Sequence, residues 1–248
     1  MSIRILICGM SGRMGQQVCA TVSAGYRDTV LVAGVDTNPC TGSVPCYTAL
    51  QDVSQSIDCI IDFSHHSATK SLTDYACANN IPLVIATTGQ TDEELAMIRS
   101  ASEQIPVFFS ANYSLGVALL VELAKKAAAA MPDADIEIVE KHHNRKLDAP
   151  SGTALMIANA IRTVREKAQL VCGRSGMAKR TPEEIGIHAV RMGNIIGEHE
   201  VLIGTDSQTI TIKHEAHSRS LFAEGAVAAA AFLVGQSAGL YDMKSLLG

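Results

Sequence analysis

The sequence predicts an α/β protein with an N-terminal parallel sheet covered by helices on both faces, followed by a second, α+β domain. In the first 113 residues, short and almost continuous apolar runs alternate with helical patterns, which is typical of parallel strands buried on both faces. A glycine-rich turn follows the first apolar run. Beyond residue 113 the rhythm changes, and three strand patterns between residues 185 and 215 follow one another without helices between them, which predicts an antiparallel sheet.

The N-terminal elements follow from the apolar runs and the patterns between them. Strands are predicted at 3–8, 29–35, 57–63, 82–87 and 105–109, and helices at 14–24, 66–79 and 91–103. Thr91 and Glu94 have the spacing of a capping box at the start of the third helix.

In the second half, Ser114 is expected to cap a long Ala- and Leu-rich helix that ends near Met131. Residues 135–140 alternate as a half-buried strand, and a polar loop leads to a helix over 151–167. Strands at 185–191, 199–204 and 209–215 and an apolar helix at 220–235 complete the chain. We expect two domains: 1–113 with 219–248, and 114–218.

Composition excludes several classes of protein. Of 248 residues, 47% are hydrophobic, and 20 basic against 25 acidic side chains give a net charge of −5, which argues against nucleic acid as a partner. No run of 18 uncharged apolar residues is present, so no membrane partner is expected. The chain enters a strand pattern at once, and its seven cysteines include no CxxC pair. A cytoplasmic protein with reduced thiols is therefore expected.

Glycines at positions 9, 12 and 15 lie between the first strand and the first helix. Glycine permits a sharp turn there and lets phosphate oxygens approach the N–H groups at the helix start. The GxxGxxG spacing is a variant of the dinucleotide-binding pattern, and a plain tight turn is the alternative.

Asp36 ends the second strand, where a carboxylate accepts hydrogen bonds from the adenosine ribose; a loop cap is the alternative. The next residue is Thr37, not a basic residue that would pair with a 2′-phosphate. We therefore expect NADH to be preferred over NADPH, with Arg13 as the one nearby cation that would soften the preference.

Two further loops leave strand ends in this half, Ala86–Gly89 and Ser110–Tyr113. Ligands of open α/β sheets bind outside those ends, and small hydroxyl and amide groups suit a ribose and a nicotinamide. Ordinary turn and capping chemistry is the alternative for each loop. His65 and His66 are expected at a helix start near the cofactor.

The densest polar cluster is EKHHNRKLDAPSGTA, residues 140–154. His142 is a candidate proton donor near neutral pH, and Lys146 would stabilise negative charge or anchor a carboxylate. Ser151, Gly152 and Thr153 open a helix whose N–H groups favour an anion. A basic loop in an acidic protein indicates an anionic small substrate. The alternatives are a zinc site, a solvated loop with an N-cap at Ser151, or an oligomer contact.

With these motifs in place, the sequence resembles the dihydrodipicolinate reductase family. ExHHxxKxDAPSGTA at 140–154 is similar to the family signature, and the resemblance extends to GxxGRMG at the start, TTG at 87–89, ANYSLG at 111–116, RxGxxxGEH at 191–199 and SR at 218–219. It covers nearly the whole chain.

The resemblance implies a Rossmann-like N-terminal domain, to which the last helix returns, and a second domain that binds substrate and builds a homotetramer. It implies NAD(P)H-dependent reduction of 4-hydroxy-tetrahydrodipicolinate, a small dicarboxylate, in the diaminopimelate route to lysine. His142 matches the proton donor/acceptor and Lys146 the second proton donor. Substrate positions match His143, Ser151, Gly152 and Thr153. Cofactor positions match Gly9, Met10, Ser11, Gly12, Arg13, Met14, Asp36, Ala86, Thr87, Thr88, Ser110, Ala111, Asn112 and Tyr113. No metal is implied.

The chain departs from the family pattern after the second strand. The family often has an acidic residue followed by Arg there, whereas this chain has Asp36-Thr37 and a shortened loop. Two other functions fit parts of the pattern. A homoserine- or aspartate-type dehydrogenase shares the glycine loop but not the 140–154 cluster, and a dinucleotide-sensing regulator has no use for His142 and Lys146 together.

Overall fold

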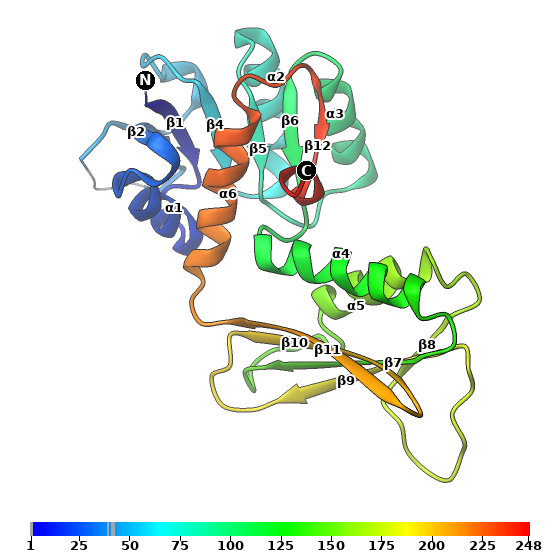
Figure 1. Ribbon diagram of the computed structural model, residues 1–248. Coiled ribbons are helices and arrows are strands. Elements are labelled where there is room, and N and C mark those ends of the chain that lie inside the picture. The colour runs from blue at the N-terminus through cyan, green and yellow to red at the C-terminus, as the bar shows by residue number, and fades with distance from the viewer. Residues whose placement is uncertain (1, 39, 41–42) are drawn as a thin grey trace. The chain divides into compact units, whose positions relative to one another are not determined.

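The computed structural model describes residues 2–38, 40 and 43–248 and divides into two compact units (Figure 1). Unit 1 comprises Met1–Leu115 and Ser220–Gly248, and unit 2 comprises Gly116–Arg219. The last helix of the chain therefore belongs to unit 1. None of the helices in the described ranges is long and apolar enough to cross a membrane.

Unit 1 contains a parallel sheet in the order β12-β6-β5-β4-β1-β2-β3. Its strands are β1 (Ile3–Cys8), β2 (Thr29–Val35), β3 (Cys46–Tyr47), β4 (Cys59–Asp62), β5 (Leu83–Ile85), β6 (Pro106–Phe109) and β12 (Gly239–Tyr241). The five predicted strands are confirmed. The sequence analysis missed β3 and β12, which are too short to produce an apolar run. The strand order reverses between β1 and β4, the point at which ligands bind in open α/β sheets.

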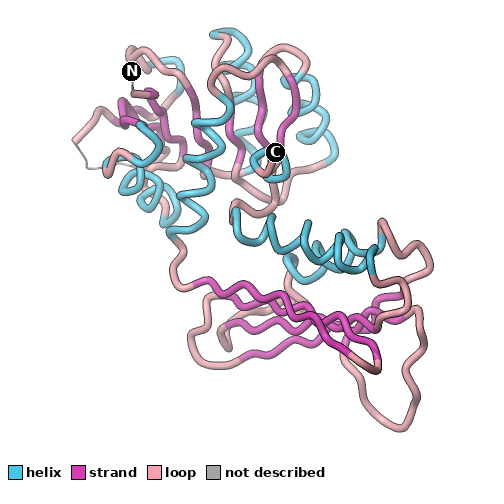
Figure 2. The backbone as a smooth tube through the Cα atoms, viewed as in Figure 1, coloured by secondary structure: helices cyan, strands magenta, loops and turns pink. Residues whose placement is uncertain are grey.

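Helices cover both faces of this sheet (Figure 2). They are α1 (Arg13–Ser23), α2 (Thr69–Asn79), α3 (Asp92–Ser102) and α6 (Ser220–Leu233), with short 3₁₀ helices at Tyr26–Asp28, Leu50–Asp52, His66–Ala68 and Met243–Leu246. Leu72 of α2 and Ile98 of α3 pack with Leu6 in one buried cluster. On the other face, the ring of Phe108 meets Phe232 of α6 edge to face. The capping box at Thr91 and Glu94 is confirmed.

Unit 2 contains a five-stranded sheet in the order β11-β10-β7-β9-β8. Its elements are α4 (Leu115–Ala130), β7 (Asp135–His142), α5 (Gly152–Arg162), β8 (Gln169–Cys172), β9 (Glu184–Arg191), β10 (Gly197–Thr205) and β11 (Gln208–Ala216). The sheet is mixed: β10 runs antiparallel to β7 and β11, as expected, but β9 runs parallel to both β7 and β8, so the expectation of a wholly antiparallel sheet is wrong. The long connection through α5 lets the chain return in the same direction, as parallel pairing requires.

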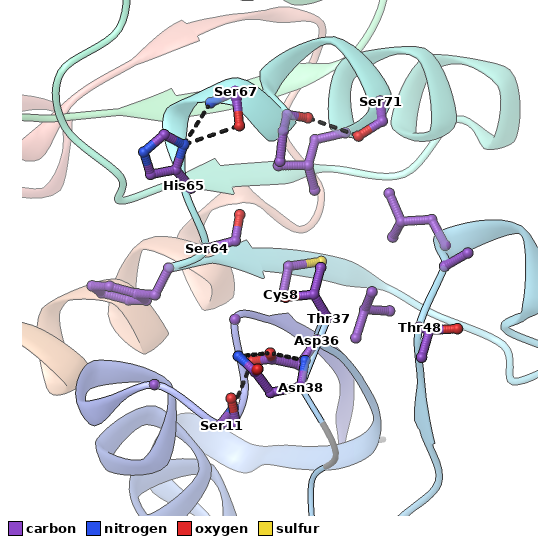
Figure 3. Close-up of a pocket in the computed structure, with 18 of the residues that line it drawn as sticks. Cys8, Ser11, Asp36, Thr37, Asn38, Thr48, Ser64, His65, Ser67 and Ser71 are labelled. Atoms are coloured by element: carbon purple, nitrogen blue, oxygen red, sulfur yellow. Dashed lines mark hydrogen bonds between the residues drawn. The ribbon is translucent and has the colours of Figure 1, made fainter.

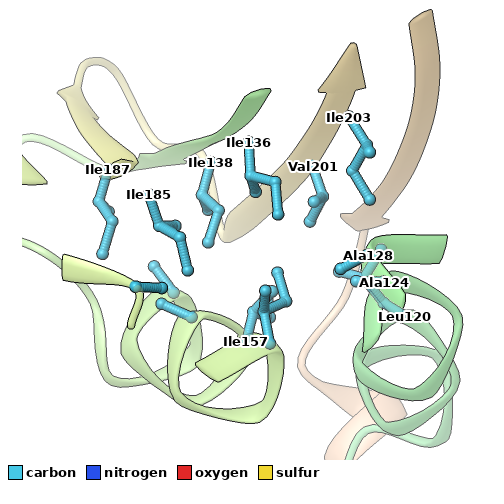
Figure 4. Close-up of a cluster of buried hydrophobic side chains, with 14 of the residues drawn as sticks. Leu120, Ala124, Ala128, Ile136, Ile138, Ile157, Ile185, Ile187, Val201 and Ile203 are labelled. Atoms are coloured by element: carbon cyan, nitrogen blue, oxygen red, sulfur yellow. The ribbon is translucent and has the colours of Figure 1, made fainter. Parts of the chain in front are cut away.

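Strand alternation places the core of unit 2 and one end of its polar cluster on the same face. Ile136 and Ile138 of β7 point toward Ile157 of α5 and Ala124 of α4 (Figure 4). The burial of β7 alternates along its length, and residues 140 and 142 continue the buried register. The next inward positions on this strand are therefore polar, which brings charged groups into the edge of an apolar core.

The cysteines correct one expectation. Cys40 and Cys46 form a disulfide with their Cα atoms 6.1 Å apart, so the prediction of seven reduced thiols is wrong for this pair. Cys8, Cys19, Cys59, Cys77 and Cys172 are free.

Candidate active site

The glycine turn of unit 1 brings three backbone segments into close contact. Gly9 follows β1 with φ 77°, and a Cβ added there would lie 2.6 Å from the carbonyl carbon of Phe63, at the end of β4. A Cβ on Gly15 would collide with the carbonyl oxygen of Gly9. Neither position has room for a side chain, so the turn and the start of α1 approach each other as a phosphate cradle requires.

The start of α1 leaves backbone donors available. Gly12 is the N-cap, and the first intrahelical bond runs from the Gln16 N–H to the Gly12 carbonyl at 2.9 Å. The N–H groups of Arg13 and Met14 precede that bond and therefore have no acceptor within the helix. The N–H of Ser11 is used differently: it donates to Asp36 at 2.8 Å.

Asp36 joins the glycine turn to the loop that follows β2 (Figure 3). Its Oδ2 accepts the Ser11 N–H, and its Oδ1 accepts the Asn38 N–H at 2.9 Å. Partial burial acts to raise the pKa of Asp36, but the hydrogen bonds from Asn38 and Ser11 outweigh it and lower the pKa below its usual value. The carboxylate is therefore ionised at neutral pH and held beside the turn.

Around Asp36 lies a cavity of about 560 Å³. Its lining combines polar groups from several loops with apolar ones from β1 and α2, among them Thr37, Gln51, His65, Cys8 and Leu72. No lysine or arginine is among the described residues that line it, and the sequence contains none from residue 28 to residue 69. The volume lies within the range of small-molecule pockets.

A buried carboxylate at the end of β4 connects the next two loops. Asp62 is 0% exposed, and its Oδ1 accepts the Ser64 hydroxyl at 2.5 Å while its Oδ2 accepts the Thr87 hydroxyl at 3.1 Å. Burial raises the pKa of Asp62 despite these hydrogen bonds. Ala86 is held in the same place, since its N–H donates to the Asp62 carbonyl at 2.9 Å.

Several other residues of the predicted cofactor set form contacts within unit 1. The Tyr113 hydroxyl donates to the Ile85 carbonyl at 2.7 Å, and the Ser110 hydroxyl donates to the Asn112 carbonyl at 2.8 Å. Met10 is buried against Gly34, whereas Thr88 and Ala111 are exposed. Of the predicted set, Gly9, Ser11, Gly12 and Asp36 line the cavity.

His65 and His66 begin a helical segment, as expected. His65 is the N-cap of the short 3₁₀ helix, and its Nδ1 accepts the Ser67 N–H. His65 also lines the cavity. His66 lies 2.9 Å from Glu94 of the capping box, which fixes the start of α2 to the start of α3.

In unit 2, the polar cluster is organised around a carboxylate to which the sequence analysis gave no role. Glu140 is 0% exposed, and its Oε2 lies 2.6 Å from Nδ1 of His142. Arg191 of β9 donates one hydrogen bond to each carboxylate oxygen, both at 2.7 Å. Burial alone would raise the pKa of Glu140, but the hydrogen bonds from Arg191, His142 and Ser151 hold that pKa below its usual value.

The same carboxylate holds the start of α5. The Ser151 N–H donates to Oε1 of Glu140 at 2.9 Å, and the Ser151 hydroxyl caps the helix by accepting the Ala154 N–H. That hydroxyl also lies 3.1 Å from Nε2 of His199. Burial first, and the charge of His142 second, lower the pKa of His199 to about 4, so its ring is neutral at pH 7.

Lys146 lies in the loop between β7 and α5, where its ammonium group pairs with Asp148 at 2.8 Å. This contact lowers the pKa of Asp148 below its usual value. For His143, burial first and the charges of Arg145 and Arg219 next lower the pKa. A Cβ on Gly152 would meet open space. The helix start is therefore approachable from that side.

The structure brings His142, Ser151 and the start of α5 together through Glu140. Sequence reasoning gave Glu140, Arg191 and His199 no role in this arrangement, although all three lie in quoted motifs, the first in the 140–154 signature and the other two in RxGxxxGEH at 191–199. One signal was present: the alternation of residues 135–142 places positions 140 and 142 on the same buried face. Among the described residues, no group of three or more His, Cys, Asp or Glu side chains is placed to hold a metal ion.

Comparisons with known proteins match both units. Two family models cover the chain, "Dihydrodipicolinate reductase, N-terminus" over residues 3–113 and "Dihydrodipicolinate reductase, C-terminus" over residues 116–247. A 4-hydroxy-tetrahydrodipicolinate reductase of Caldanaerobacter subterraneus subsp. tengcongensis is 49% identical over 100% of this chain and 99% of the relative. The enzyme of the same name from Clostridium tetani is 43% identical over 99% of this chain and 97% of the relative. A dipicolinate-bound dihydrodipicolinate reductase from Paenisporosarcina sp. TG-14 has 30% identity and a TM-score of 0.82 over 98% of each chain.

Proposed function

The chain belongs to the dihydrodipicolinate reductase family, and from this premise we propose how its side chains carry out the reaction. The protein is an oxidoreductase that reduces 4-hydroxy-tetrahydrodipicolinate with NADH or NADPH, a step of diaminopimelate and lysine biosynthesis. The observation that carries the assignment of roles is the grouping of His142, Ser151 and His199 around the buried Glu140 at the start of α5.

Unit 1 fits a reduced nicotinamide dinucleotide, which supplies the hydride. The close approach at Gly9 and Gly15 forms the cradle, and the N–H groups of Arg13 and Met14 would hold the phosphates at the start of α1. The cavity beside Asp36 would take the adenosine. The full proposed cofactor set is Gly9, Met10, Ser11, Gly12, Arg13, Met14, Asp36, Ala86, Thr87, Thr88, Ser110, Ala111, Asn112 and Tyr113. In that set, Met10 and Tyr113 support the loops from within, since both are buried.

NADH is the preferred cofactor in this proposal. The ionised Asp36 would accept hydrogen bonds from the ribose hydroxyls and repel a 2′-phosphate. None of the described residues that line the cavity is a lysine or an arginine that would offset that repulsion. A ratio of kcat/KM values that strongly favours NADPH would contradict this preference.

The substrate is a dicarboxylate, and the start of α5 would hold one carboxylate. The backbone N–H groups of Gly152 and Thr153 belong to the first turn, where the helix dipole favours an anion. Ser151 fixes this turn as its N-cap. His143 lies on the same loop, and Arg145 and Arg219 add positive charge near it.

His142 is the proposed proton donor. Hydride addition to the ring carbon of a conjugated imine leaves the electron pair on that conjugated system, where it must accept one proton. The imidazolium form of His142 would give that proton from Nε2 and take up another from water afterwards. Lys146 is the proposed second donor, whose ammonium group would stabilise the developing negative charge. Overall, the 4-hydroxy precursor takes up one hydride and one proton and loses one molecule of water.

One assay tests the function. Dihydrodipicolinate synthase would form the substrate in the cuvette from its own precursors, and absorbance of the reduced nicotinamide would be followed after adding this protein. Turnover with either cofactor supports the assignment, and binding of NADH without turnover would contradict it. A matched sample lacking the synthase controls for oxidation that does not depend on substrate.

Two features go beyond the site. We propose from the family resemblance that unit 2 builds a homotetramer. Size-exclusion chromatography with light scattering would test this by measuring the mass of the protein in solution. A monomer mass at working concentration would contradict it. The cytoplasmic location expected from the sequence stays a prediction, to be checked by fractionation of the source cells.

A further inference from the structure

Glu140 is a buried carboxylate that the reaction itself does not consume. It is 0% exposed, yet it accepts four hydrogen bonds, from His142, from both terminal nitrogens of Arg191, and from the Ser151 backbone. A carboxylate offers about four acceptor positions, so Glu140 is saturated. A group in this state cannot take up substrate or serve as a base without breaking a contact. Its role must therefore lie in what it holds.

The bond to His142 determines which ring nitrogen carries the proton. An ionised carboxylate has no hydrogen to donate, so Nδ1 of His142 is the donor in the contact at 2.6 Å. Arg191 keeps the carboxylate ionised by pairing with both of its oxygens. The proton that the ring gains and loses is then on Nε2.

The surroundings of Nε2 agree with this assignment. Nε2 has no hydrogen-bond partner in the described part of the chain, and it faces Gly197, where a Cβ would lie 3.1 Å away. The ring of His199 meets that of His142 edge to face, with the centroids 5.2 Å apart. His199 is neutral at pH 7 and therefore does not compete as a cation. Nδ1 is therefore held by Glu140, while Nε2 forms no hydrogen bond among the described residues.

Arg191 extends the same arrangement to the loop that carries Lys146. Its NH2 group donates to the Asp148 carbonyl at 2.7 Å as well as to Glu140. Asp148 in turn pairs with Lys146 at 2.8 Å. The pair formed by Glu140 and Arg191 therefore contacts the proton donor, the start of α5 and the loop of the second donor.

We propose that Glu140 and Arg191 are positioning residues that fix His142 in its Nδ1–H tautomer, with Nε2 as the proton-transferring atom, and hold it in register with the substrate-binding helix start. This inference rests on the proposed function for the identity of the transferred proton. The tautomer itself is a property of the folded chain and is measured without substrate. The two can therefore fail separately.

The first experiment measures the tautomer. Protein labelled with ¹⁵N-histidine would be studied by NMR above the pH at which the ring loses its charge, with His142→Gln used to assign the signals. The expected result is a protonated Nδ1 and an unprotonated Nε2 in the unmodified chain. Observation of the Nε2–H tautomer there would overturn the proposal, whatever the activity assay shows.

The second experiment separates positioning from general stability. Glu140→Gln should lower kcat at least roughly tenfold, which is less than the full rate contribution of a general acid. It should also increase the population of the Nε2–H tautomer of His142. NADH affinity should stay unchanged because the cofactor residues lie in unit 1. An unaltered kcat in the folded variant would overturn the proposal.

Glu137 provides the matched control. It lies on the same strand and also pairs with a histidine and an arginine, His188 at 2.8 Å and Arg180. Glu137→Gln removes a comparable charge but does not touch His142, so kcat and the His142 signals should stay unchanged. An equal loss of kcat in this control would show that any carboxylate of β7 matters, and would overturn the specific role of Glu140.

Discussion

Each unit buries one carboxylate completely, and the two have opposite electrostatics. Asp62 of unit 1 and Glu140 of unit 2 are both 0% exposed. The hydroxyls of Ser64 and Thr87 are neutral partners for Asp62, so burial prevails and raises its pKa. Glu140 has Arg191 and His142 as partners, and its pKa is lowered. Burial alone therefore does not decide the state of a carboxylate; the charge of its partners does.

The contrast agrees with what each unit is proposed to do. Unit 1 presents backbone N–H groups, hydroxyls and the partly exposed carboxylate of Asp36, which suits a dinucleotide whose carbon skeleton the reaction leaves unchanged. Unit 2 concentrates charge around a ring that is proposed to gain and lose a proton. Variants and pH profiles that act on one unit at a time test how far this contrast extends.

Removing the histidine partner of Glu140 should have the largest effect. His142→Gln should lower kcat by at least roughly a hundredfold, the size expected for the loss of a general acid, with NADH affinity unchanged. Steady-state kinetics and NADH titration measure the two quantities. The comparable variant in unit 1 is Thr87→Val, which removes a hydroxyl partner of Asp62. It should act mainly on the KM for NADH. A near-normal kcat in His142→Gln would refute its role.

Lys146 should affect both binding and turnover. Its ammonium group would stabilise the developing charge and lies on the loop that contacts Arg191 through Asp148. Lys146→Ala should lower kcat/KM about a hundredfold, with kcat reduced and the KM for the dicarboxylate raised. Lys141, which pairs with Glu198 on the same sheet, gives a control in Lys141→Ala that should leave both constants unchanged. If Lys146→Ala altered neither constant, the cluster would be structural.

The two carboxylates should differ in what their removal costs in stability. Arg191→Met leaves Glu140 buried without its cation, which should cost about 3–5 kcal/mol. Asp62→Asn keeps neutral hydrogen bonding and should change stability by less than about 1 kcal/mol. Hydrogen exchange of peptides from each unit reports the two effects separately. An equal loss of unfolding free energy in Arg191→Met and Asp62→Asn would contradict the proposed difference between the two carboxylates.

The pH dependence of stability should have opposite sign in the two units. The folded pKa of Glu140 is lowered below its ordinary value of 4.5, so its stabilisation is present above that value and is lost as the pH falls toward the folded pKa. The folded pKa of Asp62 is raised above its ordinary 3.8, so its contribution falls as the pH rises through the folded pKa. Hydrogen exchange across the acid range should show both slopes, and each should vanish in Glu140→Gln or Asp62→Asn.

Asp36 should give the smallest effect. Replacing it with Ala removes the repulsion of a 2′-phosphate, which is worth about 1 kcal/mol in water, so the NADH preference should narrow roughly fivefold. The ratio of kcat/KM values for the two cofactors measures this. An unchanged ratio would show that another group sets the preference.

Local patterns in the sequence were enough to predict the parallel sheet of unit 1 and the segments that carry both proposed sites. Continuous apolar runs, the glycine spacing and the 140–154 signature are local, because each needs only a few neighbouring residues to be recognised. The two-residue β3 and three-residue β12 gave no such signal, since their pairing partners supply the stability that their own side chains do not.

The contacts between residues far apart in the chain become visible only in the folded structure. The pairing of β7 with β9 brings Arg191 to Glu140 across 51 positions of the chain, and parallel pairing of these strands was not foreseen. His199 reaches Ser151 from β10 in the same way. The composition and the spacing of residues show which charged residues the chain contains. Which of them are buried together, and therefore which are ionised at pH 7, depends on strand pairing that the sequence specifies only through the whole fold.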